Sequence, residues 1–344
     1  MRILFLHSNI PNYVADGLFH GLRTLPDIEV VDMPRHDVMY KDATPEMLFK
    51  TGSRGRTLYA LLPKESDAIR SARVFWQREL DSYDFVIFTD IAQMPGLFMQ
   101  VWNSLGSKKA MHKIVIVDGY DQVARYPFFN TKETLLHHPW VYALPLHKVR
   151  YFKREFEDAA GLYGHLHLMQ RLRKTIRHYP ISMSIPAEAI TRVGQEQKHA
   201  LFVRYNVDPE IKDLFEQEQF APVGTSAFRF GSNEAYDDEL VAAKFGITVK
   251  RAGWDCLRHY EYAAKGVILC FKNLEQKPKP CAPFDLDKRN CIIYKDKEDL
   301  LAQLNALNQT DYNQLQENSY SWIMNYTCKE VAARFLERLI SFKD

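Results

Sequence analysis

An arginine and a glutamate lie three residues apart, at Arg258 and Glu261, in the segment from residue 245 to residue 271. The segment predicts a strand, a turn at Gly253 and Trp254, a short helix carrying both side chains, and a second strand after Gly266. At the carboxyl edge of a parallel sheet, the guanidinium could bind a diphosphate and the carboxylate a ribose diol. This spacing therefore favours a nucleotide diphosphate site, although a solvated i,i+3 ion pair has the same spacing.

Asp118 is the first candidate for a general base. It ends the apolar segment from residue 113 to residue 118, at the sheet edge where open α/β folds bind ligands. An Asp before Gly also caps turns through its side-chain oxygens, so Asp118 has a structural interpretation too. Asp16 and His20 are the rival bases, because they lie in the loop and helix after the first predicted strand.

Three further basic residues follow extended segments. Arg204 comes after the strand from residue 200 to residue 203, where it could stabilise a leaving diphosphate or lie on the surface. Lys153 and Arg154 end another extended segment, and they are either phosphate or acceptor contacts or a solvated pair.

A metal site and a redox cofactor are not expected. Asp285 and Asp287 have the DxD spelling of manganese-binding transferases, but they follow a Lys-Pro-Lys-Pro stretch outside the first nucleotide-binding unit. The histidine pairs at 137–138 and at 165 and 167 have no cysteine or carboxylate at a zinc spacing. The sequence has neither a GxGxxG motif nor a Walker P-loop, so we predict no cofactor besides a nucleotide-sugar co-substrate.

Strand-like and helix-like segments alternate along the chain, which is typical of doubly wound α/β domains. The first half has predicted strands at 2–7, 28–33, 84–89, 113–118 and 179–185, with a helix at 16–25. The second half has strands at 200–203, 245–249, 267–271 and 291–294, with helices at 209–217, at 257–261, along leucines 300 to 307, and near the end. We expect an α/β fold of two Rossmann-like domains that face a central cleft.

The expected domain boundaries follow from this pattern. Residues 1–185 form the amino-terminal, acceptor-side domain, and residues 186–325, which begin with a polar linker, form the donor domain. Residues 326–344 form a helix that we expect to pack back on the first domain.

Composition narrows the class of protein. The 344 residues are 46% apolar with a formal net charge of +2, so no strong general attraction to nucleic acid or membrane is expected. Five cysteines without a CxxC pair predict reduced core thiols. No segment has the roughly 18 apolar residues of a membrane span, and residues 1–7 lack signal-peptide features, so a cytoplasmic protein is expected.

From residue 245 to about residue 310 the chain resembles the donor domain of GT-B glycosyltransferases. The likeness lies in the 245–247 strand, Gly253-Trp254, the helix start at 257–261, Gly266, and the segments 290–294 and 297–301. It is also similar to phage DNA β-glucosyltransferases. In those enzymes the corresponding helix holds the donor diphosphate and ribose, and the base is an Asp that follows a strand. The resemblance implies that Arg258 faces phosphate, that Glu261 faces ribose, that Gly253 and Trp254 also bind the donor, and that Asp118 is the base.

Three segments of the first half are similar to bacterial GT-B proteins: residues 16–23, residues 52–58 and residues 118–121. Residues 155–240 match no known family pattern. Retaining enzymes of the GT-B fold often carry a carboxylate eight residues before the ribose-binding Glu, and here that residue is Gly253. The resemblance therefore implies an inverting reaction.

The leading hypothesis is a metal-independent hexosyl- or pentosyltransferase that moves a sugar from a nucleotide diphosphate to a glycan or lipid-linked acceptor. A transferase that modifies nucleic acid is an alternative, suggested by the basic stretch at 171–178, which is otherwise a solvated helix face. A catalytically silent protein that binds a nucleotide sugar or a glycan is the third hypothesis. Donor hydrolysis without acceptor would favour an enzyme, and salt-sensitive DNA binding would favour the nucleic-acid hypothesis.

Overall fold

The computed structural model describes residues 1–8, 10–50, 56–129, 131–157, 162–163, 177–204, 207–215 and 233–341. The chain divides into two compact units. Unit 1 comprises Met1–Met183, Pro280–Ala282 and Cys328–Asp344, and unit 2 comprises Ser184–Lys279 and Pro283–Thr327. For comparison, the sequence places the divisions after residues 185 and 325.

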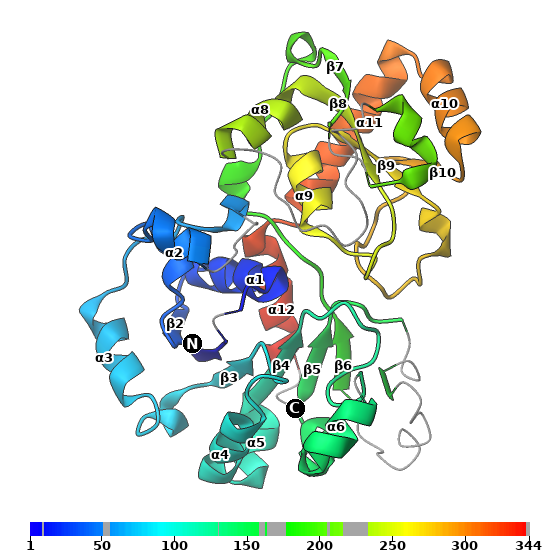
Figure 1. Cartoon of the computed structure of the whole chain (residues 1–344). Helices are drawn as coiled ribbons and strands as arrows, with labels where there is room; N and C mark the ends of the chain where they lie inside the picture. Colours follow the sequence, from blue (N-terminus) through cyan, green and yellow to red (C-terminus); the bar gives the residue numbers. More distant parts are fainter. Residues whose placement is uncertain are drawn as a thin grey trace. The chain divides into compact units, whose positions relative to one another are not determined.

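Unit 1 is built on a six-stranded sheet in which every neighbouring pair is parallel (Figure 1). Its spatial order is β2 (Glu29–Met33), β1 (Arg2–Leu6), β3 (Phe85–Phe88), β4 (Ile114–Asp118), β5 (Arg150–Lys153) and β6 (Arg177–Pro180). The chain runs from β1 outward to β2 and then returns to the other side of β1 as β3. The point between β1 and β3 is therefore the topological switch point, where open α/β sheets bind ligands.

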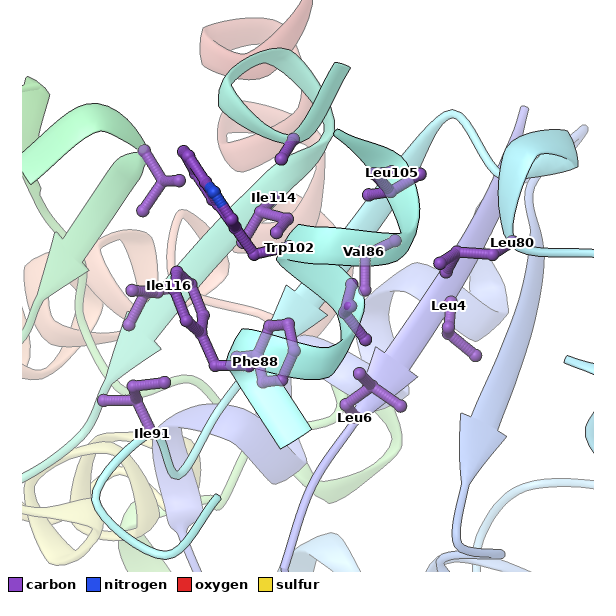
Figure 2. Packing of buried hydrophobic residues seen from close by; sticks show 14 of the residues in the cluster. Leu4, Leu6, Leu80, Val86, Phe88, Ile91, Trp102, Leu105, Ile114 and Ile116 are labelled. Atoms are coloured by element: carbon purple, nitrogen blue, oxygen red, sulfur yellow. The ribbon is translucent and has the colours of Figure 1, made fainter. Parts of the chain in front are cut away.

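Alternate residues of the central strands form the core of unit 1. Figure 2 shows Leu4 and Leu6 of β1 and Phe88 of β3 beneath Trp102 and Leu105. The last two residues belong to α4 (Pro95–Leu105), whose apolar face covers this side of the sheet. Because both faces of the strands are buried, they are continuously apolar, as the sequence predicts for parallel strands.

Six further helices of unit 1 are described: α1 (Tyr13–Thr24), α2 (Pro45–Lys50), α3 (Asp67–Phe75), α5 (Ser107–Lys113), α6 (Thr131–His137) and α12 (Cys328–Ile340). Helices α1 and α12 pack directly on each other (Figure 1). A Cβ on Gly21 of α1 would lie 1.9 Å from the carbonyl oxygen of Cys328, so only glycine permits this approach.

Unit 2 has a four-stranded parallel sheet in the order β10 (Ile292–Tyr294), β9 (Ile268–Lys272), β8 (Ala243–Thr248) and β7 (Ala200–Phe202). Its helices are α8 (Asn233–Ala242), α9 (Leu257–Ala264), α10 (Lys297–Ala306) and α11 (Gln309–Met324). Gly266 has a φ of +65°, a left-handed conformation that lets the chain turn from α9 into β9. The predicted strand, helix and strand around Arg258 are thus confirmed.

A buried lysine joins the amino ends of three of these strands. Lys198 lies just before β7, and its Nζ donates hydrogen bonds to the carbonyl oxygens of Leu240, Ala243 and Lys265 at 2.9, 2.8 and 2.7 Å. Burial lowers the pKa of this amine to about 7. Lys198 therefore ties together the edge of the sheet that is opposite the carboxyl ends of its strands.

Two predicted elements are wrong in their extent. The strand expected at 179–185 corresponds to β6, which ends at Pro180, and one further N–H, that of Ile181, donates to the Lys153 carbonyl oxygen of β5. Ile185 instead donates its N–H to the Tyr326 carbonyl oxygen. The helix expected at 209–217 is a 3-10 helix over Pro209–Leu214, interrupted by non-helical torsions at Ile211, and residues 216 and 217 lie outside the described part.

Other predictions fall wholly or mainly on residues that the structure does not describe. These are the glycine-rich segment 52–58, described only from residue 56, the histidines at 165 and 167, and the basic stretch 171–178, described only from residue 177. None of the described helices is long and apolar enough to cross a membrane. No cysteine is in a disulfide; four are buried and Cys256 is half-buried.

Candidate functional site

The predicted ribose ligand Glu261 lies on α9, which follows β8 and begins at the carboxyl edge of the unit 2 sheet. Its side chain is largely buried, with the residue 8% exposed. The hydroxyl of Tyr236, from α8, donates a hydrogen bond of 2.9 Å to Glu261 Oε2. Sequence reasoning gave no indication of this partner, since Tyr236 lies in the stretch that matches no family pattern.

Arg258 lies one turn before Glu261 and is half-buried. Burial and the Glu261 carboxylate raise the pKa of Tyr236, whereas the charge of Arg258 lowers it. Arg258 and Glu261 of α9 therefore form one electrostatic group with Tyr236 of α8. The N-terminus of α9 and Arg258 together present positive charge, as an anion site requires.

Gly253 and Trp254, also predicted to bind the donor, lie in the turn between β8 and α9. Trp254 is buried, with its ring 6.1 Å from that of Phe271 and the Lys250 ammonium 4.9 Å above it. Trp254 therefore packs against Phe271, and its role as a donor contact stays a prediction. Gly253 is half-buried, and its carbonyl oxygen accepts the N–H of Arg251.

Arg204 follows β7, as predicted, and its side chain is 65% exposed. Its backbone N–H and its Nε both donate to the Glu239 carboxylate, each at 2.6 Å. Glu239 lies on α8 and is 8% exposed. Arg204 is thus largely exposed at the carboxyl edge of the sheet, and the buried carboxylate of Glu239 binds it.

In unit 1, the predicted base Asp16 is paired with a histidine that the sequence analysis did not consider. Asp16 Oδ1 lies 2.7 Å from His36 Nε2, and Asp16 Oδ2 accepts a 2.7 Å hydrogen bond from the Tyr59 hydroxyl. Asp16 is 2% exposed and His36 6% exposed. Because a carboxylate only accepts, this contact places the His36 proton on Nε2 and leaves Nδ1 as a proton acceptor.

The backbone and ring of His36 are fixed by other neighbours. Asp32 of β2 accepts the His36 N–H at 2.7 Å and the Arg73 guanidinium at 2.5 Å. Burial raises the pKa of Asp32, but these two donors outweigh it and hold the pKa below its ordinary value. The His7 ring lies 4.2 Å from the His36 ring, and its pKa is lowered by burial and by His36. His20, the other rival base, is buried one turn after Asp16.

Asp118 ends β4 as predicted, but its carboxylate is enclosed. Oδ2 accepts the Tyr151 hydroxyl at 2.5 Å, and Oδ1 accepts both the Lys153 ammonium and the Tyr120 N–H at 3.0 Å. The side chains of Asp118 and Lys153 are fully buried. Burial and the Asp118 charge raise the pKa of Tyr151. These contacts favour the structural interpretation, a buried ion pair that also caps the turn, over the predicted role as base.

The predicted phosphate or acceptor contacts Lys153 and Arg154 are buried and bind carboxylates of unit 1. The Lys153 ammonium also donates to the Tyr120 carbonyl oxygen at 2.9 Å. Arg154 is 1% exposed, and its guanidinium binds Gly119 O and the carboxylates of Asp121 and Glu155. Both cations therefore neutralise carboxylates of unit 1 and connect the ends of β4 and β5.

The switch point between β1 and β3 is organised by Asp90. Its carboxylate accepts hydrogen bonds from the Ser8 hydroxyl at 2.8 Å and from the Asn12 amide at 2.9 Å. Asn12 also caps α1 through its side-chain oxygen. Asp90 thereby fixes the loop that leads into the helix of Asp16. The sequence signal for Asp90 is the Thr89-Asp90 pair that directly follows an apolar strand.

The DxD residues have partners of their own. Asp285 Oδ2 accepts the Tyr326 hydroxyl at 2.6 Å, and Asp287 forms an ion pair of 2.6 Å with Arg289. Among the residues that the structure describes, no group of three or more His, Cys, Asp or Glu side chains could hold a metal ion.

Comparison with solved structures identifies the fold. Anabaena Alr3699/HepE in complex with UDP is 9% identical, with 99% of this chain and 100% of that chain covered and a TM-score of 0.54. The same protein with UDP-glucose gives 10% identity, the same coverage and a TM-score of 0.53. A glycosyltransferase from Rickettsia africae gives 10% identity, coverage of 100% and 99%, and a TM-score of 0.50.

No family model and no curated protein matches the sequence. The structural likeness nevertheless extends over almost the whole chain of each neighbour. The chain has the α/β fold of GT-B glycosyltransferases, so the fold class predicted from the sequence is confirmed.

Proposed function

We propose that this protein is a glycosyltransferase that moves a hexose or pentose from a nucleotide diphosphate to a glycan or lipid-linked acceptor. The observation that carries the proposal is the first turn of α9, where half-buried Arg258 precedes buried Glu261 by one turn at the carboxyl edge of the sheet. The GT-B fold, which the chain shares with structures holding UDP and UDP-glucose, supports the same reading.

In this proposal Arg258 binds the diphosphate and Glu261 accepts hydrogen bonds from the ribose hydroxyls. A guanidinium matches phosphate oxygens with two parallel N–H donors, and the helix N-terminus adds partial positive charge. Arg204 offers a second cation, which stabilises the charge that develops on the leaving diphosphate. A uridine diphosphate sugar is the first donor to test, because the structural neighbours bind UDP and UDP-glucose.

We assign the general base to His36, positioned by Asp16. His36 Nδ1 takes the proton of the acceptor hydroxyl as that oxygen attacks the anomeric carbon, and the Asp16 carboxylate stabilises the resulting imidazolium. The nucleotide diphosphate leaves from the opposite face of the sugar, so the configuration is inverted. Gly253, at a position where many retaining enzymes of this fold carry a carboxylate, supports inversion.

We also propose that the transfer needs no metal ion. The support is that both aspartates of the DxD sequence already have partners in the protein: Asp285 binds Tyr326 and Asp287 binds Arg289. Turnover should therefore persist in EDTA, although free divalent ions can still speed release of the diphosphate. Loss of turnover on chelation, restored by manganese, would contradict this part.

Calorimetric titration with UDP tests the donor site. Glu261→Ala should weaken binding by about 1.5 to 3 kcal/mol, or roughly 10- to 150-fold, because hydrogen bonds to a charged group are lost. Glu317→Ala is the matched control, because Glu317 of α11 forms an exposed ion pair with Arg192. Equal affinities of the Glu261→Ala variant and the parent protein would refute the assignment.

A second measurement separates an enzyme from a silent binding protein. An enzyme should hydrolyse the nucleotide sugar slowly when no acceptor is present, with water taking the place of the acceptor hydroxyl. Tight donor binding with neither hydrolysis nor transfer to any glycan or lipid-linked acceptor would instead identify a binding protein of this fold.

A further inference from the structure

Helix α8 contacts two of the three residues that the proposal places at the donor, Glu261 and Arg204. Tyr236 and Glu239 are three residues apart on this helix and therefore lie on the same face. Tyr236 binds Glu261 and Glu239 binds Arg204. No family model and no sequence pattern points to this helix, so its role is visible only from the contacts.

The contact between Tyr236 and Glu261 is suited to orient the carboxylate. The phenol donates at 2.9 Å to Oε2. Because the glutamate is largely buried, losing this donor would leave a carboxylate oxygen poorly hydrated, which costs free energy. Because burial and the carboxylate raise the pKa of Tyr236, the phenol stays protonated and remains a donor at neutral pH. A glutamate side chain has three rotatable bonds. A fixed donor at one carboxylate oxygen restricts their rotation before ribose binds, so less conformational entropy is lost on binding.

We propose that Tyr236 is a positioning residue of the donor site, whose hydroxyl holds the Glu261 carboxylate in the orientation that recognises a ribose diol. The inference rests on the proposed function, since it needs Glu261 to bind ribose. It adds a consequence that the fold alone does not give: selectivity for ribonucleotides over deoxyribonucleotides depends on a tyrosine that does not itself touch the nucleotide.

The test compares UDP with 2′-deoxy-UDP and 3′-deoxy-UDP in calorimetric titrations of Tyr236→Phe and the parent protein. Removing the hydroxyl takes away the hydrogen-bond donor at Glu261 Oε2, so affinity for UDP should fall about 5- to 30-fold. At least one deoxy analogue, which lacks a hydroxyl that Glu261 binds, should lose much less affinity. The ratio of ribonucleotide to deoxyribonucleotide affinity should therefore shrink in Tyr236→Phe.

Tyr320→Phe is the matched control, because the Tyr320 hydroxyl is also buried but binds the backbone of Val193 and Thr191. It should lower the melting temperature without changing the affinity ratio. In the Glu261→Ala background, Tyr236→Phe should have no further effect on UDP binding, since the carboxylate it positions is gone.

The outcomes distinguish this inference from the proposed function. Equal losses of UDP and both deoxy analogues in Tyr236→Phe would show a merely structural tyrosine and overturn the inference. Weaker UDP binding in Glu261→Ala with unchanged binding in Tyr236→Phe would overturn the inference alone. Unchanged UDP binding in both variants would overturn the donor site and the inference together.

Discussion

The carboxyl edges of the two sheets hold their charged residues differently. In unit 1, Asp16, Asp32 and Asp118 are buried, and each is bound by at least two neighbours of the same unit. In unit 2, Arg204 is 65% exposed in its side chain and Arg258 is half-buried. The cations at the edge of unit 1, Lys153 and Arg154, are buried, whereas those at the edge of unit 2 are at least partly exposed.

This difference matches two distinct chemical requirements. A base must have its geometry and tautomer set before the substrate arrives, which buried hydrogen bonds to carboxylates achieve. Cations that bind a diphosphate must be reachable, because a phosphate group that enters needs their donors directly. Asp118 differs from Asp16 in that it forms a buried ion pair with Lys153, which favours a structural role.

The largest expected effect is on stability, at Asp118. Asp118→Asn leaves the buried Lys153 ammonium without its counter-ion, and breaking such a pair costs about 3 to 5 kcal/mol. Urea denaturation should report this loss, while turnover per folded molecule should stay near that of the parent protein. The double variant Asp118→Asn/Lys153→Met should recover much of the stability. A folded Asp118→Asn variant with turnover reduced 100-fold or more would restore Asp118 as the base.

The next effect is on turnover, at His36. His36→Gln keeps a polar side chain but removes the proton acceptor, so turnover should fall roughly 100-fold or more. Affinity for UDP should be unchanged, because the substitution lies in the unit that does not bind the donor in our proposal. Asp16→Asn should lower turnover as well by removing the carboxylate that sets the tautomer. Full activity of both variants would eliminate the pair.

The smallest effect per pH unit is a pH dependence of stability at Lys198, on the opposite edge of the unit 2 sheet. Its pKa is lowered from the ordinary 10.5 to about 7, so between these values the unfolded chain binds more protons than the folded one. The free energy of unfolding should therefore rise with pH from about 7 to 10.5, by less than about 1.4 kcal/mol per pH unit. The limit corresponds to one proton, and the three carbonyl partners favour the ammonium, so they narrow the pH range over which the two states differ.

Lys198→Met is the control for that measurement, because it has no ionisable group and should lack this contribution to the slope. Its donor affinity should match that of the parent protein, since Lys198 lies at the amino ends of the strands. A parent protein whose stability falls relative to Lys198→Met over the same pH range would contradict the assigned direction of the pKa shift.

The sequence predicted the elements well where apolar runs are long and bounded by turn residues. Strands β1 to β4 and the strand, helix and strand around Arg258 lie close to their expected positions because burial on both faces leaves a clear pattern. The expected strand at 179–185 was too long because an apolar run alone does not show where hydrogen bonding stops.

The partners of the candidate residues could not be predicted. His36, Tyr59 and Asp16 come from three separate segments that only tertiary packing brings together. Lys153 appeared as an accessible cation because sequence spacing does not show that Asp118 lies next to it in the β4–β5 register. Tyr236 is part of a helix with weak amphipathic character, so no periodic signal identified the face that meets Glu261.

The close contact of α1 with α12 has a consequence for synthesis on the ribosome. Helix α1 carries Asp16, and its Gly21 packs against Cys328 at the start of α12. All ten strands of the described sheets are translated before α12 emerges. During translation this face of α1 therefore lacks its native cover, and unit 1 completes its packing only after the nascent chain has already made unit 2.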